Sequence, residues 1–94
     1  MVAAKVKPRL LELGQTVATP AALATFPAPF IIKCLGRHVA GDWGDLDAED
    51  RATNDRGLDT EGRILSSYNH PRGKLWIITE WDRSVTTCLL PSDY

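Results

Sequence analysis

The stretch Lys74–Pro91, KLWIITEWDRSVTTCLLP, has the densest run of β-branched and aromatic residues in the chain. Such residues favour extended strands, and Asp82-Arg83 interrupts the run near its middle. The stretch therefore predicts two antiparallel strands joined by a turn. Because the turn has no glycine, a loop of three to five residues is as compatible with the sequence as a two-residue turn.

A further strand is expected just before this stretch. Residues 63–70 alternate weakly between apolar and polar side chains, and His70-Pro71-Arg72-Gly73 then suits a type I turn with glycine in a left-handed bulge. A three-residue loop of this kind would place Tyr68 opposite Trp76. The sequence thus predicts a three-stranded antiparallel β-meander.

Both faces of this meander are expected to be apolar. One face would carry Leu65, Leu75, Ile77 and Trp81, and the other Ile64, Tyr68, Trp76, Ile78 and Glu80. A single layer of short helices covers only one face, and an uncovered apolar face of this size is typical of a protein interface. We therefore expect a homodimer.

Short helices are predicted before the meander. Thr19 can cap a helix from Pro20 to about Phe26, and the apolar positions of Phe30–His38 follow a helical period. Asp47 can cap a third helix, from Ala48 to Asn54 or Leu58, with Leu46, Ala52 and Leu58 facing inward. The expected class is α+β, with N-terminal short helices packed on the meander.

The composition is that of one domain spanning residues 1–94, with residues 1–9 as a flexible arm. The formal net charge of −1 gives no excess of positive charge for a nucleic-acid partner. Cys34 and Cys88 each lie in an apolar run and are expected to be buried thiols, which fits a cytoplasmic protein. No segment is long and apolar enough to predict a membrane helix. Without a nucleotide-binding loop or zinc-ligand spacing, we expect no cofactor and no metal ion.

Three groups of residues are candidates for a site. In the first, His38 precedes the loop Asp42-Trp43-Gly44-Asp45 and could form an acid–base pair with a carboxylate, or half of a metal site. The alternative is structural: His38 closes the inner face of its helix on a backbone carbonyl, and Asp42 and Asp45 shape the turn. Trp43 would be the anchor for a partner.

The second group is Glu80 with Arg83 at the end of a predicted strand. A carboxylate among apolar neighbours needs a partner, for which Arg83, Arg63 and His38 are the candidates. An ion pair that fixes the hairpin is one interpretation. The other is a catalytic trio of His38, Glu80 and Arg83, as in small ribonucleases that stabilise a pentavalent phosphate.

The third group surrounds the first hairpin turn. Its members are basic, aromatic or amide residues: Tyr68, Asn69, His70, Arg72 and Lys74. Such a tip can contact nucleic acid, although the same residues are common in solvated turns.

Three blocks resemble a known family: residues 14–20 (GQTVATP), 37–46 (RHVAGDWGDL) and 76–91 (WIITEWDRSVTTCLLP). The family comprises small bacterial proteins of plasmids and other mobile elements, labelled "plasmid-related" or "type I restriction endonuclease subunit M". The resemblance covers most of residues 13–94. It implies a genetic setting and supplies no catalytic residues, and 94 residues are too few for the Rossmann-like domain of a methyltransferase.

The favoured function is a non-enzymatic accessory protein of a mobile element, acting as a homo-oligomeric binding module. Its binding residues would be Asp42, Trp43, Asp45, Tyr68 and Trp76, and its partner an unidentified protein. The first alternative is a small nuclease or toxin-like hydrolase that uses His38, Glu80 and Arg83. The second is a nucleic-acid-binding module.

Overall fold

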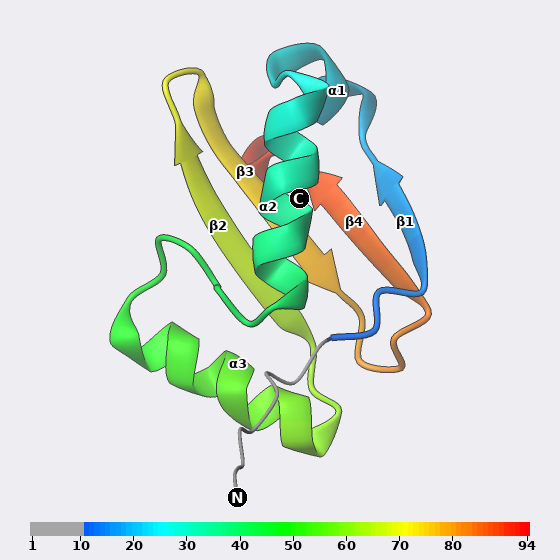
Figure 1. The fold of residues 1–94 in the computed structure, drawn as a ribbon, viewed down its shortest axis with the longest axis vertical. Coiled ribbons are helices and arrows are strands. Elements are labelled where there is room, and N and C mark those ends of the chain that lie inside the picture. Colours follow the sequence, from blue (N-terminus) through cyan, green and yellow to red (C-terminus); the bar gives the residue numbers. More distant parts are fainter. Residues whose placement is uncertain (1–10) are drawn as a thin grey trace, which may run out of the picture.

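A four-stranded mixed sheet forms the centre of the molecule (Figure 1). The computed structural model describes residues 11–94, so the arm predicted over residues 1–9 lies outside the described part. The strands are β1 (Gln15–Ala18), β2 (Ile64–His70), β3 (Gly73–Thr79) and β4 (Val85–Leu89). Their order is β1-β4-β3-β2, with β1 parallel to β4 and the other pairs antiparallel. The α+β class is confirmed and the meander is present, but the three-stranded sheet is wrong because β1 adds an edge strand.

Three α-helices follow β1 along the chain, as expected, and a 3-10 turn, η1 (Pro91–Asp93), follows β4. The helix α1 (Pro20–Thr25) begins at Thr19, whose hydroxyl accepts a hydrogen bond from the Ala22 amide. The helix α2 (Ala28–Val39) begins earlier than predicted, because Pro29 lies in its first turn, where no amide hydrogen is needed. The helix α3 (Ala48–Thr60) is capped by Asp47 at 2.8 Å from the Asp50 amide.

The register of the β2–β3 hairpin differs by one residue from the prediction. Tyr68 lies opposite Leu75, whereas Trp76 lies opposite Ser67. Pro71 and Arg72 alone form the turn, since Gly73, at φ +135°, is paired with His70 and does not form a bulge. Because side chains alternate between faces, this shift moves Tyr68 to the face of Leu75.

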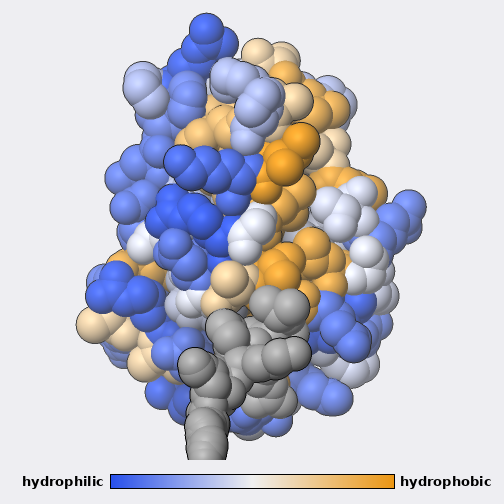
Figure 2. Space-filling model, viewed as in Figure 1, coloured by the Kyte–Doolittle hydropathy of each residue, from blue (hydrophilic) through white to orange (hydrophobic). Residues whose placement is uncertain are grey.

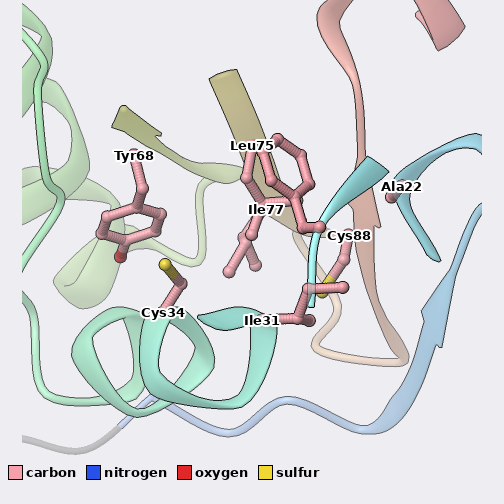
Figure 3. Packing of buried hydrophobic residues seen from close by; sticks show 8 residues of the cluster. Ala22, Ile31, Cys34, Tyr68, Leu75, Ile77 and Cys88 are labelled. Atoms are coloured by element: carbon pink, nitrogen blue, oxygen red, sulfur yellow. The ribbon is translucent and has the colours of Figure 1, made fainter. Parts of the chain in front are cut away.

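One face of the sheet, termed here the α2 face, carries the main core. Figure 3 shows Cys34 pointing from α2 toward Tyr68, while Ile77 of the sheet packs in the same cluster. The buried members are Ala22, Phe26, Ile31, Cys34, Tyr68, Leu75, Ile77 and Cys88. Both thiols are free and buried, as predicted, and burial raises the pKa of Cys88 to about 11.

The opposite face, termed here the Trp76 face, carries Leu65, Trp76, Ile78 and Leu89. The last residues of the chain cover part of it, since the Tyr94 ring lies 6.0 Å from the Trp76 ring. Ile78 and Leu89 are buried there, and Trp76 is half-buried. The surplus apolar face expected from the sequence is therefore smaller than predicted.

The helix α3 packs against the start of β2, and Leu46 and Leu58 face inward as predicted. Its buried positions are Asn54 and Gly57, whereas Ala52 is exposed. A Cβ atom at Gly57 would lie 2.9 Å from the Ile64 side chain, so glycine permits this close approach. The polar sequence of α3 gave no apolar period from which this face could be found.

Candidate functional site

A chain of buried polar side chains runs through the core from α2 across the sheet. His38, at the end of α2, has no exposed surface. Its Nδ1 lies 2.5 Å from Ser66 Oγ on β2, and its Nε2 lies 2.9 Å from Thr79 Oγ1 on β3. Thr79 Oγ1 lies 2.7 Å from Thr86 Oγ1 on β4, and Thr86 donates to the Leu13 carbonyl at 2.8 Å.

The direction of each hydrogen bond in this chain follows from its last member. A carbonyl only accepts, so the Thr86 hydroxyl donates to Leu13 and its oxygen accepts from Thr79. Thr79 then accepts from His38 Nε2–H, which leaves Nδ1 as the acceptor for the Ser66 hydroxyl. His38 is thus neutral, with its proton on Nε2, and burial lowers its pKa to about 4. Both nitrogens are occupied by structural partners, hydroxyls where the sequence suggested a backbone carbonyl.

The loop Asp42–Asp45 is tightly held by neighbouring groups. Asp42 accepts two hydrogen bonds from the Arg37 guanidinium, at 2.7 and 3.2 Å, and this pair lowers the Asp42 pKa. Tyr68 donates its hydroxyl hydrogen to the Asp42 carbonyl at 2.7 Å, while the Arg37 guanidinium lies 4.7 Å above the Tyr68 ring. Tyr68 is fully buried. Asp42 and Tyr68, both predicted to bind a partner, therefore hold the loop against the sheet.

Trp43 is a core residue of this loop. Its side chain is 3% exposed, and its indole N–H donates to Asp55 on α3 at 2.9 Å. It packs with Leu11 and Ile64 in a second apolar cluster. The prediction that Trp43 anchors a partner does not fit this burial. A single tryptophan in a loop between Gly41 and Gly44 belongs to no apolar period, so the sequence could not distinguish a core role from a surface role.

The outer edge of β2 is closed by groups from the loop and from α3. The Asp45 amide donates to the Ser67 carbonyl at 2.6 Å, and the Ser67 amide donates to the Trp43 carbonyl at 3.2 Å. Asp45 Oδ2 accepts from the Asn69 amide at 2.8 Å. Further along, the Asn54 side-chain amide pairs with both backbone groups of Leu65, at 2.7 and 3.3 Å. Asp45 and Asn54 thus prevent β2 from pairing with another strand.

The side chains of the proposed trio, His38, Glu80 and Arg83, bind separate partners, although the Arg83 guanidinium also donates to the Glu80 backbone carbonyl at 3.2 Å. His38 binds hydroxyls on the α2 face. Glu80 forms an ion pair with Arg63 at 3.5 Å, one of its predicted partners, and is half-buried. The Arg83 guanidinium donates to the carbonyls of Gly62 and Gly57, at 2.6 and 2.9 Å, near the end of α3.

An aromatic and basic group at the chain end was missed by the sequence analysis. Arg63 donates to the Tyr94 hydroxyl at 2.6 Å, and Tyr94 packs edge-on against Trp76. The adjacent Asp93 carboxylate accepts from the Thr19 hydroxyl at 2.7 Å, which fixes the C-terminal residues to the start of α1. Tyr94 belongs to no periodic pattern of side chains, and such a pattern would have been the only signal for this contact.

The tip of the β2–β3 hairpin packs on the helices. The His70 ring lies 4.5 Å from the Phe30 ring and 5.2 Å from the Phe26 ring. Arg72 donates to the Thr25 carbonyl at 3.3 Å. Lys74 and Asn69 remain exposed, as the solvated-turn interpretation expects.

A small open pocket of about 250 Å³ lies between α3 and β2. Its lining residues are Leu46, Asp50, Thr53, Asn54, Arg63 and Leu65. Asn54 and Arg63 already bind Leu65, Tyr94 and Glu80.

No protein family, no curated protein and no solved structure matches the chain. Within residues 11–94, no three or more histidine, cysteine or acidic side chains are arranged to hold a metal ion. No helix in that part of the chain has the length and apolar character needed to cross a membrane.

Proposed function

We propose that the protein is a non-enzymatic accessory protein of a mobile genetic element, and that it acts in the cytoplasm as a homo-oligomeric binding module. The genetic setting rests on the resemblance of residues 14–20, 37–46 and 76–91. The binding role rests on one observation about the surface. Large apolar side chains are exposed on the helices, where Leu23 of α1 is 60% and Ile32 of α2 is 67% exposed.

The helices that carry these residues also carry apolar surface. Figure 2 shows apolar surface along the part of α2 nearest β1 and over α1, whereas the surface over β2 is largely hydrophilic. Exposed apolar area of this kind is characteristic of protein interfaces. A second contact surface is available on the Trp76 face, where Trp76 and Tyr94 supply aromatic side chains beside Arg63. We assign self-association to the β1 side and a protein partner to the Trp76 face.

The hydrolase alternative has less support. It requires His38 to exchange a proton with a substrate, but this ring has no exposed surface and its nitrogens bind Ser66 and Thr79. The nucleic-acid alternative is weakened by the net charge of −1 and by the packing of His70 and Arg72 against the helices.

The first test of the proposal is the mass of the wild-type protein in solution, measured by light scattering after gel filtration. A mass at least twice that of one chain is expected at micromolar concentration. A monomer at every concentration up to about 200 µM would refute the homo-oligomeric role, because an interface that weak contributes less than about 5 kcal/mol.

The second test concerns the partner surface. Trp76→Ala removes the aromatic side chain from the Trp76 face, and Trp81→Ala is the matched control, since Trp81 is 62% exposed in the β3–β4 loop. Proteins cross-linked to the wild type in cells that carry the mobile element should be lost with Trp76→Ala and retained with Trp81→Ala. Equal recovery with both variants, each checked for folding by circular dichroism, would reject the Trp76 face as the partner surface.

A further inference from the structure

The two edges of the sheet differ in what covers them. The edge at β2 is closed by Asp45, Asn54 and the backbone of Trp43. The edge at β1 is exposed from Gln15 to Val17, and within residues 11–94 no group is hydrogen-bonded to its outer side. Strand pairing can therefore extend the described sheet at β1 and not at β2.

The backbone of β1 presents a short and defined set of groups at this edge. The amides of Gln15 and Thr19 donate toward β4, to the carbonyls of Ser84 and Cys88. In a parallel ladder alternate residues point to the same side, so Thr16 and Ala18 direct their N–H and C=O groups outward. Gly14, at φ +63°, and Pro20, which has no amide hydrogen, limit the edge on either side.

The side chains of this edge also favour pairing. Natural edge strands are protected by charged residues or proline, but Gln15, Thr16, Val17 and Ala18 include neither. Val17 is 39% exposed on the Trp76 face, and on the other side apolar surface covers α1 and the part of α2 nearest β1 (Figure 2). A partner strand would thus bring apolar surface together on both sides of the sheet.

We propose that β1 of one molecule pairs antiparallel with β1 of a second copy, with Val17 opposite Val17 on the twofold axis. In this register Thr16 of each copy lies opposite Ala18 of the other. The outward N–H and C=O groups of both residues are then hydrogen-bonded on each strand. The edge is self-complementary in length, because Gly14 and Pro20 end it at the same places in both copies. The sealed β2 edge stops further addition, so the assembly closes as a dimer with an eight-stranded sheet.

This pairing rests on the proposed function, because it requires the protein to be a homo-oligomer. It further specifies which interface forms that oligomer. Interfaces of stable complexes bury about 800 Å² on each partner, more than four strand residues alone supply. The apolar surface over α1 and over the part of α2 nearest β1 provides the additional contact area (Figure 2).

Cysteine cross-linking tests the register. In the proposed register Val17 of one copy lies directly opposite Val17 of the other, as a pair that is not hydrogen-bonded. The Cα atoms of such a pair are about 4.5 Å apart, a distance that a disulfide can span. Val17→Cys should therefore form a covalent dimer on mild oxidation. Gln15→Cys is the matched control on the same face, because its copy lies about 13 Å away across four residues of strand. Cys34 and Cys88 are buried, so the wild type should not cross-link.

Cross-linking of Val17→Cys without Gln15→Cys supports the register, and equal cross-linking of both, or of neither, overturns it. A second experiment measures the mass of Val17→Lys, which places two ammonium groups at the axis, against Val17→Thr, which is similar in shape and uncharged. We expect Val17→Lys to be monomeric and folded and Val17→Thr to be dimeric.

A dimeric Val17→Lys protein would overturn the β1 interface while leaving the homo-oligomeric function standing. A monomeric wild type would overturn both. A protein that dimerises only after residues 1–10 are removed would show that its own N-terminal residues occupy the edge, and this result would also overturn the proposal.

Discussion

The buried histidine predicts a specific loss of stability in mild acid. In the folded protein burial lowers the His38 pKa from its ordinary value of 6.5 to about 4. The unfolded chain therefore binds the proton more readily, and stability must fall as the pH decreases below 6.5 toward 4. The difference between these two pKa values predicts that the free energy of unfolding falls by about 2 kcal/mol from pH 7.5 to 5.0. The full loss, reached below pH 4, is about 3 kcal/mol.

The assay is urea unfolding followed by circular dichroism at pH 7.5 and 5.0, with His38→Gln as the matched variant. Glutamine can retain one polar contact but does not titrate, and the variant keeps every other ionisable group. The wild type should lose about 2 kcal/mol more than His38→Gln over this interval. An equal loss in both proteins would refute the buried, neutral state of His38 and with it the polar chain to Thr86.

Three further predictions concern residues that the structure places in supporting roles. Trp43→Phe should cost about 1–2 kcal/mol in urea unfolding, because an indole hydrogen bond to α3 is lost in the core, whereas an exposed anchor would be nearly neutral. Asn54→Ala should lower the free energy of unfolding by about 1–3 kcal/mol and increase aggregation, measured by light scattering. The reason is that both backbone groups of Leu65 at the β2 edge lose their partner. Unchanged stability and aggregation would contradict the role of Asn54 in closing this edge. Glu80→Gln should change stability by no more than about 0.5 kcal/mol, because its ion pair with Arg63 is partly exposed; a larger loss would indicate a site at Glu80.

Local signals in the sequence predicted where α1 and α3 begin. Thr19 and Asp47 cap α1 and α3 because a short polar side chain before a helix satisfies amides within the same few residues. The hairpin pairs β2–β3 and β3–β4 were also predicted, since β-branched and aromatic runs favour strands wherever they pair.

Features set by distant parts of the chain were not predicted. The strand β1 is four residues long and exposed, and it forms only because β4 offers an edge to it. The hairpin register depends on whether Gly73 enters the ladder, which the turn sequence alone does not determine. Burial of Trp43 depends in the same way on α3, more than ten residues further along the chain.

In the candidate site, too, local sequence identified residues, whereas distant parts of the chain determined their roles. His38, Asp42 and Tyr68 were candidate site residues, and the structure connects them: Tyr68 donates to the Asp42 carbonyl, and His38 binds Ser66 on the same strand as Tyr68. Their roles could not be assigned without the hydroxyl and carbonyl partners, because a buried histidine and a catalytic one have the same local sequence.

Hydrogen exchange of three consecutive amides in β1 tests the central proposal most directly. Val17 points toward β4 and should be protected at all protein concentrations, whereas Thr16 and Ala18 point outward. Pairing of two copies predicts that Thr16 and Ala18 are protected at high concentration and exchange rapidly on dilution. Rapid exchange of Thr16 and Ala18 at every concentration, with Val17 still protected, would contradict the dimer formed through β1.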